Sequence, residues 1–369
     1  MLKDILTKRG LLPILTHSDG TEVTAGTWDI RRREMLAALE THSYGHTPPV
    51  PKRVWGEILD PAEPEFTDAY AGKVRQERIR LSFETEHGVC SFPFVLAVPK
   101  HTKCPPVFLH LAFRHDLPDR YVPVEEITDA GYALAVVCYK DMVNDNLNGD
   151  FSDGIAAHFG TASKRSHEEW GKIGMWAYGA SRILDYLLTR RDIDAAHTAV
   201  IGHSRLGKTA LWAAAQDERF FAAISNNSGY GGAATSKHGE GERVRDFLRC
   251  GSWDWYCETF KQYTDEKEDK KPYDQAYLLA LIAPRYLCVG SAAEDRGADP
   301  VSEFLTSLWA SQAWDLLGKT GLVTPDRMPV PGDALQDGTV GYHLRAGQHF
   351  LSREDWNTYI RFLDRKLGR

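Results

Sequence analysis

The chain has 369 residues, 43% of them hydrophobic, which is enough to bury a large core without disulfides or a structural metal. Its formal net charge of −7 argues against a nucleic-acid partner, because proteins that bind a polyphosphate backbone usually carry a clustered basic excess. The six cysteines show no C-x-x-C spacing, and we interpret them as reduced core residues.

Charges interrupt the first ten residues, which hold no apolar stretch of the length that a secretory signal or a membrane span requires. We therefore expect a cytoplasmic location and no membrane partner. Two charged runs, the three arginines at 31–33 and the mixed stretch 265–271, are expected on solvated surface.

In chain order, residues 1–75 are rich in proline and charge around one amphipathic stretch at 30–44, so they are predicted to form an N-terminal extension packed on a main domain at 76–369. Alternating or continuous apolar runs then predict strands at 77–83, 94–98, 107–111, 133–138, 198–202, 222–225, 286–290 and 340–344. Helical periodicity predicts helices at 170–188, 208–216, 302–317 and 353–367. This alternation indicates a mostly parallel, doubly wound sheet with helices on both faces and active groups at the carboxyl ends of its strands.

The sharpest turn between a strand and a helix is Gly202-His-Ser-Arg-Leu-Gly-Lys208. Small residues around Ser204 allow the strained turn of a nucleophile elbow, which exposes the hydroxyl and aims helix N-terminal amides at a developing oxyanion. The spacing departs from G-x-S-x-G, because Leu206 takes the place of the second glycine. An ordinary turn with a helix-capping serine is the alternative.

A nucleophilic serine needs a base, and the base needs a carboxylate, in the order Ser, acid, His for the α/β-hydrolase fold. After the strand at 286–290 come Glu294, Asp295 and Asp299, and we choose Asp295 as the acid, leaving Glu294 open. Asp299 precedes a proline and is typical of a helix start.

His349 lies in a loop between the last predicted strand and the final helix, where this fold places its catalytic histidine. Its competitor, His343, falls within the strand pattern and is interpreted as a sheet-face histidine satisfied by a neighbour. The other histidines lack metal-ligand spacing, and no dinucleotide or P-loop fingerprint occurs, so we expect neither a metal nor a cofactor.

These residues, taken together, resemble the bacterial glucuronoyl esterases and acetylxylan-esterase-like proteins, a carbohydrate-esterase family of the α/β-hydrolases. The segment 202–208 is similar to the family signature G-[CH]-S-R-x-G-K, and the likeness continues through further segments in family order. Those segments are 131–135, 170–188, 227–232, 241–244, 281–285, 294–300 and 341–345.

The resemblance implies a role for three further residues. Arg205 would help to bind the oxyanion, while Lys208 and Glu242 would contact sugar hydroxyls, with Glu240 open as an alternative to Glu242. A guanidinium beside a forming oxyanion is worth several kcal/mol at most, about the scale of one lost oxyanion donor. The alternative for Lys208 is a solvated lysine in the first helical turn.

Two positions depart from the family pattern. Asn227 stands where many glucuronoyl esterases carry the triad glutamate, so the acid's role should pass to Asp295. Gly297 stands where a tryptophan that contacts the 4-O-methyl group of the glucuronate would be expected, so one apolar wall of the sugar site is missing. This puts recognition of methylglucuronate in doubt and leaves ester hydrolysis intact.

We therefore predict a serine esterase acting on a small carbohydrate ester through an acyl-enzyme on Ser204. A glucuronoyl esterase and an acetylxylan or carbohydrate deacetylase share one tetrahedral chemistry, so the sequence leaves both open. A hypothesis of another class is a non-catalytic sugar-binding relative. The presence of Ser204, Asp295 and His349 together disfavours it.

Overall fold

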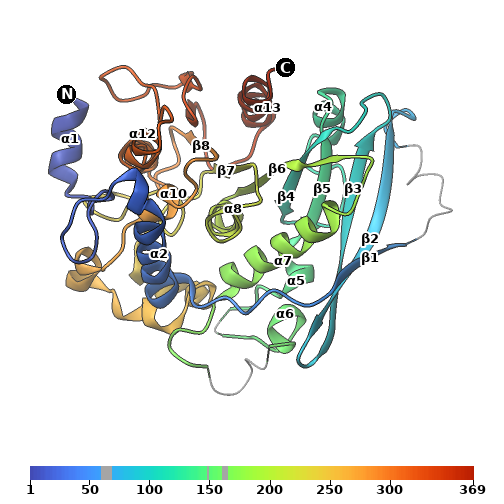
Figure 1. The fold of residues 1–369 in the computed structure, drawn as a ribbon, viewed down its shortest axis with the longest axis horizontal. Helices are drawn as coiled ribbons and strands as arrows, with labels where there is room; N and C mark the ends of the chain where they lie inside the picture. Colours follow the sequence, from blue (N-terminus) through green and yellow to red (C-terminus); the bar gives the residue numbers. More distant parts are fainter. Residues whose placement is uncertain (60–68, 148, 160–164) are drawn as a thin grey trace.

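The computed structural model describes residues 1–59, 69–147, 149–159 and 165–369. Within them one mixed sheet has the strand order β1-β2-β3-β5-β4-β6-β7-β8-β10-β9 (Figure 1). The strands are β1 Val54–Leu59, β2 Val74–Thr85, β3 Gly88–Pro99, β4 Pro106–Ala112, β5 Ala133–Cys138, β6 Asp194–His203, β7 Ala222–Asn226, β8 Tyr286–Ala292, β9 Ala334–Leu335 and β10 Val340–Arg345.

The six strands from β5 through β4, β6, β7 and β8 to β10 pair in parallel, and antiparallel pairs flank them on both sides. The principal helices are α1 Leu2–Arg9, α2 Trp28–Leu39, α4 Val124–Asp129, α5 Tyr139–Met142, α6 Gly154–Ala157, α7 Lys172–Leu187, α8 Arg205–Gln216, α9 Val244–Cys250, α10 Gln275–Ala280, α11 Pro300–Ala310, α12 Gln312–Leu316 and α13 Arg353–Leu367. This arrangement confirms the predicted mostly parallel, doubly wound sheet.

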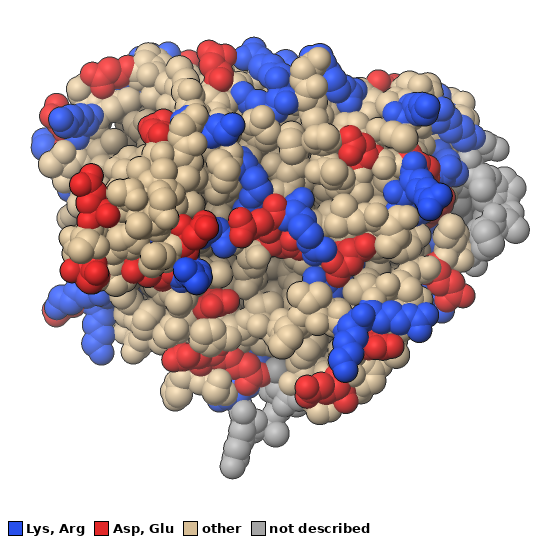
Figure 2. Space-filling view, in the orientation of Figure 1, with Lys and Arg blue, Asp and Glu red and all other residues tan. Residues whose placement is uncertain are grey.

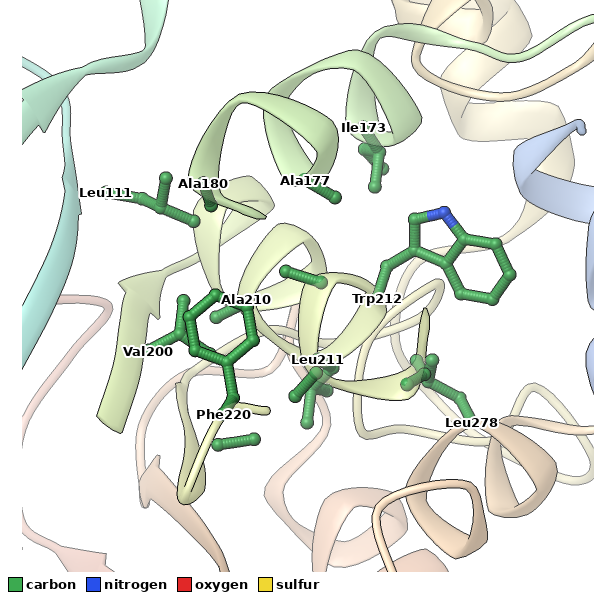
Figure 3. Packing of buried hydrophobic residues seen from close by; sticks show 14 of the residues in the cluster. Leu111, Ile173, Ala177, Ala180, Val200, Ala210, Leu211, Trp212, Phe220 and Leu278 are labelled. Carbon is green, nitrogen blue, oxygen red and sulfur yellow. The ribbon is translucent and has the colours of Figure 1, made fainter. Parts of the chain in front are cut away.

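Successive residues of the buried strands serve opposite faces of the sheet. On β4, Leu109 and Leu111 join the cluster built around α7 and α8, whereas Phe108 joins the one built around α4 and α13. Figure 3 shows the first cluster, in which Trp212 of α8 lies near Ile173 and Ala177 of α7. Because both faces are covered, the strands read as continuous apolar runs, which is why the sequence located them.

The N-terminal part packs against the helices of the first face. Tyr44 is fully buried and its ring stacks on that of Trp212 with centroids 4.3 Å apart. Residues Val54–Leu59, which the sequence analysis did not recognise as a strand, pair with β2 and extend the sheet. The predicted division at residue 75 falls inside β2, and the division itself stays a prediction.

Two charged segments differ from their predicted solvation. Arg31 is only 4% exposed, because its guanidinium donates to the carbonyls of Ile14 and Pro13 and to the Tyr277 hydroxyl. Lys271, at the end of the mixed run, is buried and donates to the hydroxyls of Tyr230 and Ser236. The prediction of a solvated stretch is therefore wrong at these positions, because buried carbonyls and hydroxyls offer the cations hydrogen bonds.

The cysteines and the surface complete the picture. All six cysteines are free; four are buried, while Cys104 and Cys250 are exposed, so the core interpretation is wrong for those two. On the face in Figure 2, acidic and basic side chains are interspersed and form no single basic field. None of the described helices is both long and apolar enough to span a membrane.

Candidate active site

The candidate residues all follow neighbouring parallel strands. Ser204 comes directly after β6, Asn227 after β7, Asp295 three residues after β8, and His349 in the loop after β10. Since β6, β7, β8 and β10 are adjacent and parallel, their carboxyl ends lie along one edge of the sheet. Residues more than 140 positions apart in sequence meet there, as this fold predicts.

Ser204 lies in a strained turn. Its backbone has φ 58° and ψ −127°, a conformation that non-glycine residues rarely adopt, and its N–H donates to the Asn226 carbonyl at 2.9 Å. A Cβ on Gly202 would lie 2.1 Å from the Leu206 carbonyl oxygen, so the turn requires glycine there. Leu206 is fully buried, which explains an apolar side chain where the usual motif has its second glycine.

His349 and Asp295, the predicted base and acid, are hydrogen-bonded to each other. The imidazole Nδ1 lies 2.5 Å from Oδ2 of Asp295, and that same oxygen accepts a hydrogen bond of 2.8 Å from Nδ2 of Asn227. Burial raises the pKa of Asp295, but the hydrogen bond and charge of His349 outweigh it, and the net pKa is lowered. The residue chosen from sequence thus contacts His349, whereas Glu294 is exposed.

Asn227, which stands where many family members carry the acid, therefore donates a hydrogen bond to the predicted acid Asp295. Its side chain is 1% exposed, and it neutralises part of the negative potential on Asp295 without competing for the proton. The sequence indicated that the acid had moved, but it gave no sign that the two positions converge on one oxygen.

The loop that carries His349 is held by a buried arginine. The guanidinium of Arg345 donates to the carbonyls of Ala346, Gln348 and Phe350 at 2.8, 3.0 and 2.5 Å, and its Nε donates to Asp355 at 2.8 Å. Bonds on both sides of His349 fix the path of the loop. Sequence reasoning did not assign this role, although an arginine that ends a strand before a glycine-containing loop is a signal that could have suggested it.

The two competing candidates have structural roles. His343 is 3% exposed and its Nε2 lies 2.7 Å from Oδ1 of Asp355, which confirms the prediction of a satisfied sheet-face histidine. Asp299 caps α11 by accepting a hydrogen bond from the Ser302 N–H, which confirms its prediction as a helix start.

Ser204 and His349 open into the same cleft of about 300 Å³. The cleft is lined by Phe113, Arg114, Arg120, Tyr121, His203, Ser204, Arg205 and His349. Among the described residues the Ser204 hydroxyl has no hydrogen-bond partner, a common state for a nucleophile before substrate enters.

A second histidine, His203, lies beside His349. The rings of His203 and His349 have centroids 4.4 Å apart, and Nδ1 of His203 is hydrogen-bonded to Asn226 at 2.7 Å. Burial, reinforced by the neighbouring His349, lowers the pKa of His203 to about 3. His203 consequently stays neutral when His349 takes up a proton.

Arg205 is oriented toward the cleft by a buried acid. Its Nη1 lies 2.5 Å from Oδ2 of Asp145, and its guanidinium carbon lies 4.3 Å from the centre of the Trp255 ring. Asp145 also accepts hydrogen bonds of 2.8 Å from Trp255 Nε1 and from the Tyr139 hydroxyl. Neither Asp145 nor Trp255 was identified from the sequence as a partner of Arg205.

Lys208 and Glu242 lie outside the residues that line the cleft. Lys208 is 2% exposed and its ammonium donates to the carbonyls of Ser228 and Tyr230 and to Glu242, at 2.7, 2.6 and 3.0 Å. These three bonds use every donor of the ammonium. The predicted sugar contact of Lys208 requires exchange of one of them and stays a prediction, as does that of the half-exposed Glu242.

A buried carboxyl group, that of Glu303, lies near Asp295. Glu303 of α11 is fully buried and accepts hydrogen bonds from the N–H groups of Ser228 and Gly229 and from the Ser291 hydroxyl. Burial, opposed by these donors, raises its pKa to about 7. Glu303 therefore ties the turn after β7 to the end of β8.

One group of described residues has the donor types of a metal site. Ligand atoms of His115, Cys138 and Asp141 lie within 4.8 Å of one another, and Nδ1 of His115 already pairs with Asp141 at 2.9 Å. None of the three lines the cleft with Ser204, and the chemistry of the triad does not involve them.

A strained serine after a parallel strand, with a histidine and a hydrogen-bonded aspartate after later strands, defines a serine hydrolase of the α/β-hydrolase fold. The profile of the family described as Glucuronyl esterase, fungi, matches residues 128–318. A curated carbohydrate esterase from an unknown prokaryotic organism is 36% identical over 96% of this chain and 88% of its own length. The chain belongs to the glucuronoyl esterase family and is a carboxylic ester hydrolase of the carbohydrate-esterase class.

Other relatives agree with this assignment. The structure of the glucuronoyl esterase from Solibacter usitatus is 34% identical and superposes with a TM-score of 0.86, covering 95% of this chain and 96% of that one. A 4-O-methyl-glucuronoyl methylesterase from Schizophyllum commune is 28% identical over 74% of this chain and 64% of its own length. The family and the fold inferred from the sequence are confirmed.

Proposed function

We propose that this chain hydrolyses esters in which glucuronic acid is the acyl group, with Ser204, His349 and Asp295 as its catalytic triad. The observation that carries the proposal is the hydrogen bond of 2.5 Å between Nδ1 of His349 and Oδ2 of Asp295, since His349 lines the same cleft as Ser204. Membership of the glucuronoyl esterase family supports the choice of acyl group.

In the first step, Nε2 of His349 takes the proton of the Ser204 hydroxyl while Oγ attacks the ester carbonyl. Asp295 holds Nδ1 and stabilises the imidazolium that forms. The histidine then returns its proton to the leaving alcohol, which leaves the uronic acid bound to Ser204 as an ester. Water, activated by the same histidine, releases the acid and restores the serine.

The tetrahedral oxyanion has two sources of stabilisation. The first N–H groups of α8 have no partner within the helix, so that of Arg205, next to the nucleophile, is available to the oxyanion. The guanidinium of Arg205 supplies positive charge, and its pairing with Asp145 fixes its place before the reaction begins.

A second candidate function is removal of acetyl groups from a carbohydrate. It is favoured by the open space at Gly297, where a Cβ would meet only Oδ1 of Asp295, at 3.7 Å. A glycine at this position offers no aromatic side chain to the methyl group of 4-O-methylglucuronate. An acetyl ester needs no such wall.

The test is a comparison of purified protein and the Ser204→Ala variant on benzyl glucuronate, acetylated xylo-oligosaccharide and p-nitrophenyl acetate. The proposal predicts hydrolysis of the glucuronate ester that the variant loses. Release of acetate alone would assign the second function. If the folded protein hydrolyses none of the three substrates, both candidate functions are overturned and a sugar-binding relative is favoured.

A further inference from the structure

The cleft around Ser204 is cationic although the chain as a whole is acidic. Three arginines are among its eight lining residues, and no carboxylate is among them. The chain carries a formal net charge of −7. A cationic lining in a net acidic protein indicates that the cleft is adapted to negative charge.

Two of the arginines have no acidic partner. Arg205 is paired with Asp145, but Arg114 and Arg120 form no ion pair with any described residue. Arg120 donates to the Tyr121 hydroxyl at 3.0 Å and lies over that ring, which holds the guanidinium at the cleft. Within the part of the chain that the structure describes, neither of these two guanidinium groups has an ion-pair partner, and both line the cleft that holds Ser204.

The two aspartates on the same segment are not paired with these arginines. Asp116 and Asp119 make no ion pair with either arginine, and Asp119 accepts a hydrogen bond from the Tyr121 N–H at 2.7 Å. The triad carboxylate is likewise committed, because Asp295 is bonded to His349 and Asn227.

The two arginines also mark the ways out of the cleft. Arg114 lines a neighbouring hollow of about 500 Å³, whose wall holds Arg78 and His115 together with Asp116 and Asp141. Arg120 lines another hollow of about 820 Å³, whose charged lining residues are mainly acidic, with Asp119, Glu125, Glu126 and Glu354. A substrate that extends beyond the sugar bearing the ester would pass one of these guanidinium groups.

We propose that Arg114 and Arg120 form a subsite for a carboxylate next to the scissile ester, so that the preferred substrate is an acidic carbohydrate ester. The inference rests on the proposed function and adds a requirement for a second, free carboxyl group. Arginine suits this ligand because its planar fork makes two parallel bonds to a carboxylate. The carboxylate comes from a neighbouring uronic acid residue or from the alcohol that leaves.

Two matched pairs of substrates test the subsite and separate these sources. The first is a diuronic acid with one esterified carboxyl group, compared with its analogue in which the free carboxyl is reduced to an alcohol. The second is 4-carboxybenzyl glucuronate compared with benzyl glucuronate. We expect kcat/KM to be about tenfold higher for the acidic member of one pair at low ionic strength.

The preference should fall with salt, since the Debye length drops from about 30 Å at 0.01 M to about 3 Å at 1 M. It should also disappear in the Arg114→Gln, Arg120→Gln double variant, measured as the ratio of kcat/KM between the acidic and the neutral member of each pair. Arg245→Gln is the matched control, because Arg245 is an exposed arginine outside the cleft.

Equal kcat/KM within both pairs, or a preference that survives the double variant, would overturn the subsite. Hydrolysis of the neutral esters reports on the proposed function separately. If the neutral esters are turned over and the acidic members gain nothing, the subsite alone is refuted. If no ester of either pair is hydrolysed, the glucuronoyl assignment fails as well.

Discussion

Replacement of Arg345 tests whether the loop that carries His349 must be held in place. The side chain is 5% exposed and makes four hydrogen bonds, three of them to carbonyls that flank His349. In Arg345→Met, Asp355 loses a buried partner and the carbonyls lose their donors. We expect the free energy of unfolding to fall by about 3–5 kcal/mol, the usual cost of breaking a buried pair.

The catalytic effect should exceed what instability alone produces. A displacement of His349 by about 1 Å would lower kcat by roughly 100-fold, with KM nearly unchanged, because geometry and not binding is lost. Arg345→Lys should recover part of kcat by retaining the bond to Asp355. The assay is steady-state hydrolysis of p-nitrophenyl acetate, with urea unfolding of each variant.

Arg285 provides the matched control. It too is a largely buried arginine that donates to main-chain carbonyls, those of Asp217, Phe220 and Ala214, but it precedes β8 at the opposite end from Asp295. Arg285→Met should lose comparable stability and keep its kcat under conditions where it is folded. Unchanged kcat in folded Arg345→Met, or an equal loss in both variants, would refute the positioning role.

Three further outcomes follow from the site. Asp295→Asn should lower kcat by about 10⁴-fold in the same ester assay. Adding Asn227→Glu should raise kcat again by at least tenfold, because the side chains of residues 227 and 295 meet beside His349. A double variant no faster than Asp295→Asn would contradict this. Burial raises the pKa of Glu303 from 4.5 to about 7, so between these pH values the folded protein holds a proton on Glu303 that the unfolded chain releases. The free energy of unfolding, measured with urea, should therefore fall by about 3 kcal/mol as the pH rises from 4.5 to 7. Glu303→Gln should lack this fall, and an equal fall in the variant would contradict the raised pKa of Glu303. Gly297→Trp should lower KM for a 4-O-methylglucuronate ester about threefold to tenfold relative to the unmethylated ester. If the ratio of the two KM values stays unchanged, residue 297 does not contact the methyl group.

The parallel core could be predicted from local apolar patterns, and the contact between His349 and Asp295 from the order of the candidate triad along the chain. Strands buried on both faces give continuous apolar runs, and α13 was located at its observed bounds by its helical periodicity. The triad followed because the fold fixes the order of serine, acid and histidine along the chain. Asp295 was separable from Asp299 because a proline after an aspartate marks a helix start.

The partners of the triad could not be predicted, because their contacts join distant parts of the chain. Asp145 and Trp255 meet Arg205 across 60 and 50 positions, and Asn227 meets Asp295 across 68. The short edge strand Val54–Leu59 also escaped notice, since all six of its residues are half-buried or exposed and it lacks a clear alternation.

Charge patterns misled for a different reason. Arg31 and Lys271 lie in runs that look solvated, but each is surrounded by carbonyl or hydroxyl oxygens from elsewhere in the fold. Only a tertiary structure supplies such acceptors. The hydrogen bonds of the Lys208 ammonium to Ser228, Tyr230 and Glu242 likewise could not be read from its motif, and its predicted sugar contact stays a prediction.

The central claim is that His349 and Asp295 activate Ser204, and covalent labelling with phenylmethylsulfonyl fluoride tests it most directly. Peptide mass mapping should find one sulfonyl group on the peptide that contains Ser204. Labelling should vanish in Ser204→Ala and slow by at least about 10³-fold in His349→Ala, since the imidazole no longer removes the proton. A label on another residue, or labelling of Ser204 that does not depend on His349, would contradict the account.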